Sequence, residues 1–152
     1  MGSIEYAALA VWIASHGIVG YTLGQYLFDR PLVGLLGGVA ADTDFLFPAM
    51  LEWPFVHRGI THTLLVGSLA TGLVAYRYRR AGLTVGVTYA SHLLIDVTTP
   101  KGIPHLYPFV EENFHLDLWT TGHSPGPTAL TWICCLGMLW LIHTGRLDAP
   151  RF

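Results

Sequence analysis

The chain has 152 residues, which is enough for a single domain. Hydrophobic residues make up 52% of it and charged residues only 12%, whereas a soluble domain usually carries about 25% charged residues. Because so few charges cannot cover a water-exposed surface, we expect an integral membrane protein; the net charge of -2 excludes a strongly basic surface, so no nucleic-acid partner is expected.

Five apolar segments follow one another along the chain, and each approaches the roughly 17–20 residues that cross a hydrocarbon core. They cover residues 4–26, 31–48, 60–76, 83–99 and 127–145. The second segment is short and glycine-rich, so it forms either a full span or a re-entrant helix. The sequence therefore predicts an all-α, polytopic membrane bundle of about five hydrophobic helices, with four or five spans, in one domain over residues 1–152.

The connections predict how this bundle is oriented. Residues 77–82 form a basic loop, and residues 100–126 form one long connection rich in proline and aromatic side chains. Aromatic residues favour the membrane interface, and lysine and arginine favour the cytoplasmic side. We therefore expect a multi-pass protein of the cell (inner or plasma) membrane with 100–126 as an extracytoplasmic interfacial loop. The arginines assigned to the cytoplasmic side are Arg30, Arg77, Arg79, Arg80, Arg146 and Arg151, with Arg58 and Lys101 opposite.

Ionisable residues lie inside or at the edges of these segments, where each is a candidate functional residue. Most belong to four segments whose polar ends can meet at one depth, on the extracytoplasmic side. These are His16, Asp42, Asp44, His57, Arg58, His62, His92 and Asp96. His143 lies near the opposite end of its segment, and we treat it as structural.

Two pairs of these residues have informative spacing. His92 and Asp96 are four residues apart, so they share one helix face and can hold one metal ion or two adjacent ions. Asp42 and Asp44 are separated by one residue. A turn could direct both carboxylates inward, or one could be a ligand while the other supports a ligand.

The stretch HRGITHTLL, residues 57–65, opens the third segment with polar side chains. His57 and His62 fit no single helix face unless His57 precedes the helix. Thr61 could then cap that helix, and Arg58 would lie beside the site. Three imidazoles and several carboxylates fit zinc, or a site with manganese or magnesium. Such an ion lowers the pKa of bound water to about 7 and supplies hydroxide.

An early histidine, the run ADTD at 41–44, HRGITHTLL at 57–65, HLLIDVTTPKGI at 92–103 and YPF at 107–109 together resemble the YdjM-like family. These are LexA-binding, inner-membrane-associated proteins assigned as metal-dependent hydrolases, and the resemblance covers roughly residues 10 to 110. The family is distantly similar to zinc-dependent phospholipase C and the P1-type nucleases, which are all-helical. The full three-zinc cluster of those enzymes would also use a His-x-x-x-Glu pair, and no such pair follows Asp96 in this sequence. The resemblance therefore implies one or two ions rather than three.

The resemblance implies phosphoester hydrolysis at a site built from named positions. The implied metal ligands are His16, Asp42, Asp44, His57, His62, His92 and Asp96. Arg58 would bind the phosphate, and Asp44 or Asp42 would act as general base where it is not a ligand. The loop residues His105, His115 and His123 are candidates for a further ligand or substrate contact.

The function expected from the sequence is a membrane-embedded, metal-dependent hydrolase of a phosphoester. Its partners would be the lipid bilayer and an amphiphilic substrate, a lipid or lipid-linked phosphate. Two alternatives remain open: a metal or proton transporter that uses the same residues as a pathway, and a non-catalytic membrane module stapled by a metal.

Overall fold

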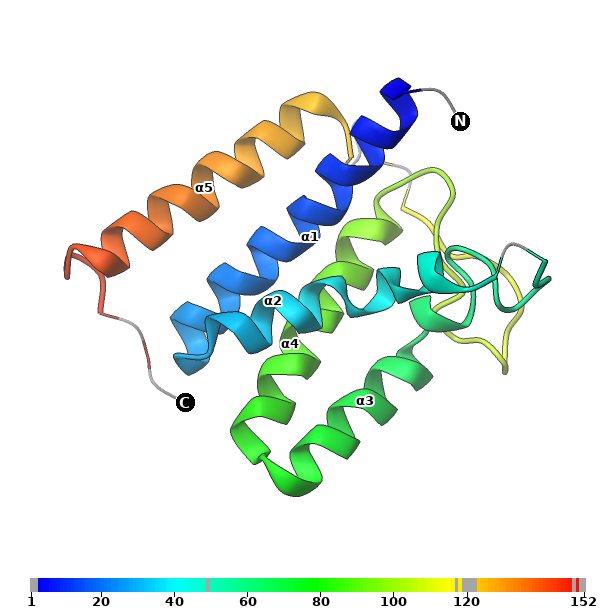
Figure 1. Ribbon diagram of the computed structural model, residues 1–152, viewed down its shortest axis with the longest axis horizontal. Coiled ribbons are helices and arrows are strands. Elements are labelled where there is room, and N and C mark those ends of the chain that lie inside the picture. Colours follow the sequence, from blue (N-terminus) through cyan, green and yellow to red (C-terminus); the bar gives the residue numbers. More distant parts are fainter. Residues whose placement is uncertain (1–2, 49, 117, 119–122, 149, 151–152) are drawn as a thin grey trace.

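The computed structural model describes residues 3–48, 50–116, 118, 123–148 and 150. This part of the chain contains five α-helices and two 3-10 helices and no strand, apart from one isolated bridge between Ile103 and Phe114 (Figure 1). The α-helices are α1 (Ser3–Phe28), α2 (Pro31–Val39), α3 (Leu64–Arg77), α4 (Arg79–Val97) and α5 (Pro125–His143), and the 3-10 helices are η1 (Ala40–Leu46) and η2 (Ile60–His62). The predicted all-α class is confirmed.

Each predicted apolar segment overlaps one of these α-helices, but two segments change geometry near the polar residues. The second segment begins as α2, with Pro31 in its first turn, and continues as η1. The third begins as η2 and then becomes α3. The tighter 3-10 turns therefore coincide with the aspartate pair and with His62.

The predicted basic loop at 77–82 is wrong, because Tyr78 alone separates α3 from α4. Arginine and alanine favour helix, so the helical conformation resumes at Arg79. The two helices also approach closely here: a Cβ atom on Gly82 would overlap Ala75. A tight α3–α4 hairpin replaces the loop.

Glycines bring the backbones of α1 and α2 into direct contact. Gly20 and Gly24 of α1 face Gly34 and Gly38 of α2, in the small-xxx-small spacing that lets helices pack closely in membranes. A Cβ atom on Gly24 would lie 2.8 Å from the Gly34 Cα, and one on Gly38 would lie 2.6 Å from the His16 carbonyl oxygen. This packing brings the end of α2, and hence η1, beside the middle of α1.

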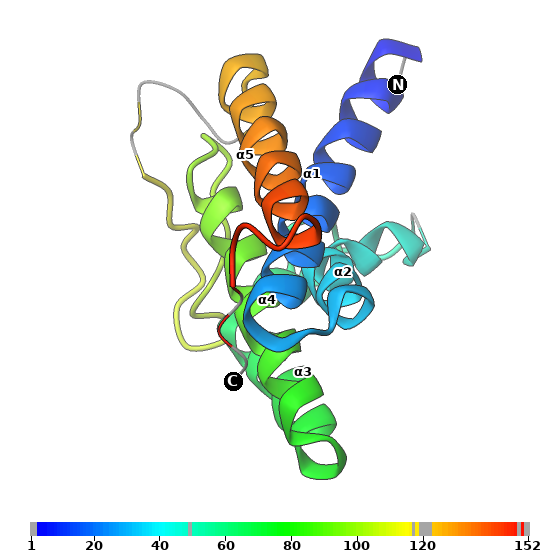
Figure 2. The same ribbon diagram turned by 90° about the vertical axis from the view of Figure 1, so that its left-hand side faces the viewer.

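The helices form an open bundle with its long loops at one end (Figure 1). The α1–α2 turn, the α3–α4 turn and the C-terminal end of α5 lie away from those loops. α4 packs against α1, α2 and α3, whereas α5 packs mainly on α1. Figure 2 shows α5 and α1 diverging toward their N-terminal ends.

Two helical stretches in the described residues are long and apolar enough to cross a membrane, Ala7–Phe28 and Pro125–His143. The shorter helix α3 is apolar but has 14 residues, and α2 has nine. The prediction of four or five spans is therefore not confirmed by length and composition, and only two helices meet that test.

We expect Gly34→Leu to lower the free energy of unfolding by about 2–3 kcal/mol, because the new side chain must enter the α1 backbone. Gly72→Leu is the matched control, since a Cβ atom on Gly72 meets no atom of the described residues within 4 Å. Thermal unfolding in detergent, followed by circular dichroism, measures both variants. Equal midpoints for the two would contradict the close α1–α2 packing.

Candidate metal centre

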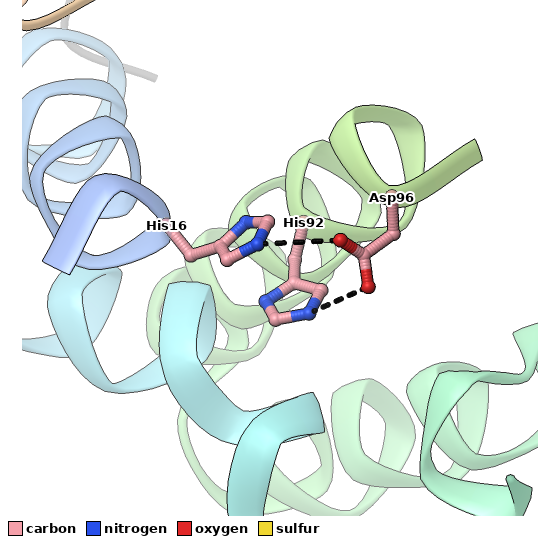
Figure 3. A group of neighbouring side chains, drawn as sticks. All are labelled: His16, His92 and Asp96. Atoms are coloured by element: carbon pink, nitrogen blue, oxygen red, sulfur yellow. Dashed lines mark ion pairs between the residues drawn. The ribbon is translucent and has the colours of Figure 1, made fainter. Parts of the chain in front are cut away.

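The residues predicted as metal ligands, together with Arg58, lie in one region, where α1, η1, η2 and α4 meet. α1 contributes His16, and α4 contributes His92 and Asp96. Figure 3 shows these three side chains pointing toward one another from two helices. The two imidazole rings stack with their centroids 3.7 Å apart and an interplanar angle of 19°.

The carboxylate of Asp96 is the centre of this region, and the residue is only 1% exposed. Its Oδ1 lies 3.4 Å from Nε2 of His16. Its Oδ2 lies 3.3 Å from Nε2 of His62 and 3.6 Å from Nε2 of His92. The expectation that the i, i+4 pair on α4 faces one site is met, since His92 and Asp96 point the same way (Figure 3).

The two aspartates of η1 have different surroundings. Asp42 Oδ1 lies 3.8 Å from Nε2 of both His62 and His92, and its buried Oδ2 has no hydrogen-bond partner in the described structure. Asp44 instead lies behind the imidazoles, on their Nδ1 side: Oδ1 is 3.2 Å from Nδ1 of His57, and Oδ2 is 3.2 Å from Nδ1 of His62. Asp42 therefore faces the centre of the cluster, whereas Asp44 orients the imidazole rings of His57 and His62 from their Nδ1 side.

Asp44 also fixes the backbone of the HRGITH stretch. Its Oδ2 accepts hydrogen bonds from the Arg58 backbone N–H at 2.9 Å and the Thr61 hydroxyl at 3.0 Å. Arg58 is in the left-handed region, with φ of 62°, a conformation that costs about 1–3 kcal/mol for a non-glycine residue. The carboxylate of Asp44 thus stabilises both the turn and the two histidines within it.

The predicted helix cap at Thr61 is wrong. Thr63 caps α3, with its hydroxyl oxygen accepting a hydrogen bond from the Val66 backbone N–H at 3.1 Å. The turn η2 delays the start of α3 to Leu64, which leaves Thr61 free to donate to Asp44. Tyr89 of α4 donates to the Thr61 carbonyl and ties the turn to the bundle.

The hydrogen bonds behind the rings determine which imidazole nitrogen carries the proton. Nδ1 of His92 is 2.7 Å from the Gly38 carbonyl oxygen, which can only accept, so Nδ1 is the donor. Nδ1 of His62 likewise donates to Asp44. In the neutral rings both Nε2 atoms then carry lone pairs, although they lie only 3.3 Å apart and beside two carboxylates. Such a set of acceptors repels itself unless a further proton or a metal ion lies among them.

These donors fit a divalent metal ion. Imidazole nitrogens held by a carboxylate or carbonyl on their far side are the usual ligand arrangement for zinc. Two groups of ligand atoms each lie within 4.8 Å of one another, and together they allow one or two ions. The first group is His16, His92 and Asp96, and the second is Asp42, His57 and His62.

His123, from the loop before α5, joins the first group. Its Nε2 lies 3.4 Å from Asp96 Oδ1 and 3.3 Å from Nε2 of His16. Burial and the charge of Arg58, opposed by Asp96, lower the pKa of His123 to about 4, so the ring is neutral at physiological pH. The structure does not bring the other two loop candidates here: His105 packs its ring on Phe114, and His115 is exposed.

Two cationic side chains border the imidazole cluster. The buried guanidinium of Arg58 donates to Asp96 Oδ1 at 3.1 Å and to the Thr99 hydroxyl. Lys101 donates to the His57 carbonyl at 3.2 Å; burial and the charge of Arg58 lower the pKa of its ammonium group, against the pull of Asp44 and Asp96. Lys101 is not among the site residues predicted from the sequence. The sequence pattern that indicates it is its predicted location, with Arg58, on the opposite side of the membrane from the other cationic residues.

A cavity of about 640 Å³ opens onto this cluster. Its lining includes apolar side chains of α1, namely Leu9, Trp12 and Ile13. It also includes the polar side chains Asp42, His57, Arg58, Asp96 and Lys101. A ligand in this cavity would contact both charged groups and hydrocarbon.

A family model described as YdjM inner membrane protein matches residues 6–149, nearly the whole chain. The chain belongs to this family. The resemblance seen in the motifs is therefore confirmed, and the family description associates these proteins with the inner membrane, consistent with two helices that could span it. No curated protein and no solved structure was found to match the chain. The YdjM family description names no reaction, so the activity must be argued from the site.

We expect Asp44→Asn to weaken metal binding by about 10–100-fold, because carboxylates that orient histidine ligands contribute that much to affinity. The amide cannot accept all four hydrogen bonds that Asp44 receives. Asp148→Asn, at an exposed position outside the site, is the control. Competition with a fluorescent zinc chelator measures both variants, and an unchanged Kd for Asp44→Asn would refute this supporting role.

Proposed function

We propose that this YdjM-family protein is a membrane-embedded, metal-dependent hydrolase that cleaves a phosphoester in a lipid or lipid-linked substrate. The observation that carries the proposal is the convergence of imidazole Nε2 atoms on Asp96, beside a cavity that also presents Arg58 and Lys101. A structural metal needs only a closed set of ligands. An open cavity with two cations suits an anionic substrate.

The residues assigned to hold the metal are the two groups described above, with His123 as an additional ligand. Zinc fits the imidazoles and carboxylates best, and manganese or magnesium would fit the carboxylates. When bound, one or two such ions lower the pKa of water to about 7 and stabilise charge on a phosphoester. Three carboxylates, from Asp42, Asp44 and Asp96, balance the positive charge of the ions.

Arg58 and Lys101 would bind the phosphate. The guanidinium of Arg58 presents several N–H groups in one plane, which matches phosphate oxygens. Its hydrogen bonds to Asp96 and Thr99 hold that plane at the cavity wall, and its buried Nε makes no hydrogen bond within the described chain. Lys101 lines the same cavity and adds a second positive charge.

Asp42 is the better candidate for the general base in a site where it is not itself a metal ligand. It lines the cavity, and its Oδ2 has no partner among the described residues. A carboxylate in that position can accept the proton that leaves the attacking water. Asp44 already accepts hydrogen bonds on both oxygens, so we assign it to orienting His57 and His62.

The membrane orientation that fits this site puts it on the extracytoplasmic side. α1 and α5 would cross the bilayer, and the shorter helices would complete a multi-pass bundle. The α1–α2 turn, the α3–α4 turn and the end of α5 lie away from the loops that border the site (Figure 1). Arg30, Arg77, Arg79, Arg80 and Arg146 belong to these three regions, and the positive-inside rule assigns them to the cytoplasm.

A metal or proton transporter is the main alternative, and it would need polar groups through the whole membrane depth. In the described structure the two groups of metal-binding candidates adjoin each other instead, since Nε2 of His62 lies 3.3 Å from Nε2 of His92. A non-catalytic module stapled by a metal would need neither the cavity nor Arg58. The presence of the cavity and of Arg58 in its lining therefore favours hydrolysis.

Hydrolysis of p-nitrophenyl phosphate and bis(p-nitrophenyl) phosphate by the purified protein, loaded with zinc or manganese, tests the proposal. We expect metal-dependent turnover that falls at least about 1,000-fold in His92→Ala, because an imidazole at the centre is lost. His143→Ala is the matched control, since His143 lies at the far end of α5 and should retain activity. Absence of metal-dependent turnover in the wild type, or an unaffected His92→Ala variant, would contradict the assignment.

A further inference from the structure

A second cavity, of about 750 Å³, lies between α1 and α5. It shares Ala8, Trp12 and His123 with the cavity at the metal centre, so the two cavities border the same side chains. Both volumes lie within the roughly 300–1,000 Å³ that is typical of ligand pockets. A ligand that occupies both cavities would pass along these three residues.

Most of the lining of the second cavity is apolar. Small or aliphatic side chains of α1 and α5, such as Val11 and Ala129, leave the space open. The two tryptophans that border it have satisfied indole N–H groups: Trp12 donates to the His123 carbonyl at 3.2 Å, and Trp132 donates to the Ser15 hydroxyl at 2.8 Å. Because these polar atoms are already paired, the rings present hydrocarbon to the cavity.

The walls of this cavity are the two helices that can span a membrane. They diverge toward their N-terminal ends, the end at which the cavity lies (Figure 2). An opening between two spans faces the bilayer rather than water. The occupant that such a space meets first is a lipid hydrocarbon chain.

We propose that the α1–α5 cavity binds a hydrocarbon tail of the substrate, which enters sideways from the bilayer while its phosphate reaches Arg58 and Lys101. The identity of the head group rests on the proposed function, but the tail site rests on the cavity itself. His123 marks the junction: its ring stacks on Trp12, with centroids 5.0 Å apart, and its Nε2 lies at the metal centre. The apolar and the polar side chains that line the site thus match the two ends of an amphiphile.

Filling the α1–α5 cavity tests this tail site through substrate selectivity. Ala129→Phe and Val11→Phe place an aromatic ring in the cavity. Cys134→Phe is the control, because Cys134 is exposed on α5 and lies outside the cavity. For both filled variants we expect at least a 10-fold loss in hydrolysis of dioleoyl phosphatidic acid in nanodiscs, with p-nitrophenyl phosphate hydrolysis unchanged. Equal losses for both substrates, or no loss for the lipid, would overturn the tail site.

A binding measurement separates this proposal from hydrolysis. Phosphatidic acid with a diazirine near the end of one acyl chain is photolysed with the full chain in nanodiscs, and adducts are mapped by mass spectrometry. We expect adducts on Val11, Ala129 and Trp132 in the wild type that fall at least 5-fold in Ala129→Phe, while adducts on the exposed Leu136 stay constant. This outcome supports the tail site even if no phosphoester is hydrolysed, in which case the proposed function alone fails. Cavity adducts that are absent, that persist in the filled variant, or that are replaced by cross-links between two copies would overturn it.

Discussion

The main physical constraint on this structure is the crowding of buried hydrogen-bond acceptors around Asp96. Two imidazole Nε2 atoms with lone pairs lie 3.3 Å apart, next to carboxylate oxygens of two aspartates. In a buried environment the repulsion among such acceptors is weakly screened, and Arg58 contributes only one balancing charge. A divalent ion bound among these atoms would give each lone pair a partner, so the same residues would serve as a ligand set. This crowding of acceptor atoms is the physical basis of the proposed metal chemistry.

The rest of the fold holds these candidate ligands in place through hydrogen bonds on the far side of the imidazole rings. Asp44 fixes two histidines and the turn that carries them, and the Gly38 carbonyl fixes His92. Gly38 also contacts α1 backbone beside His16, so the glycine packing of α1 on α2 sets both the position of a ligand and the orientation of its neighbour. The close contact between α1 and α2 therefore also brings the imidazole nitrogens of the site together.

Much of this arrangement could be predicted from the sequence. The five helices follow from apolar segments, and the shared face of His92 and Asp96 follows from their spacing. The different environments of Asp42 and Asp44 could not be predicted, because they depend on a 3-10 turn that tertiary packing imposes. The same is true of Lys101, which reaches the site along a loop whose path no local pattern specifies. His123, from the same loop, is one of three predicted candidates, and the sequence alone does not distinguish it from His105 and His115. The basic loop predicted at 77–82 is a helix hairpin instead, because a single residue, Tyr78, is enough to turn the chain.

A cation is expected at Asp96, and the metal content of the protein measures its presence. The protein would be purified in detergent without chelators and analysed by inductively coupled plasma mass spectrometry, together with His62→Ala and Asp96→Ala. The wild type should hold at least one equivalent of zinc or manganese, and both variants should lose that metal. A wild-type protein that is folded but holds no tightly bound metal, even after reloading, would contradict this expectation.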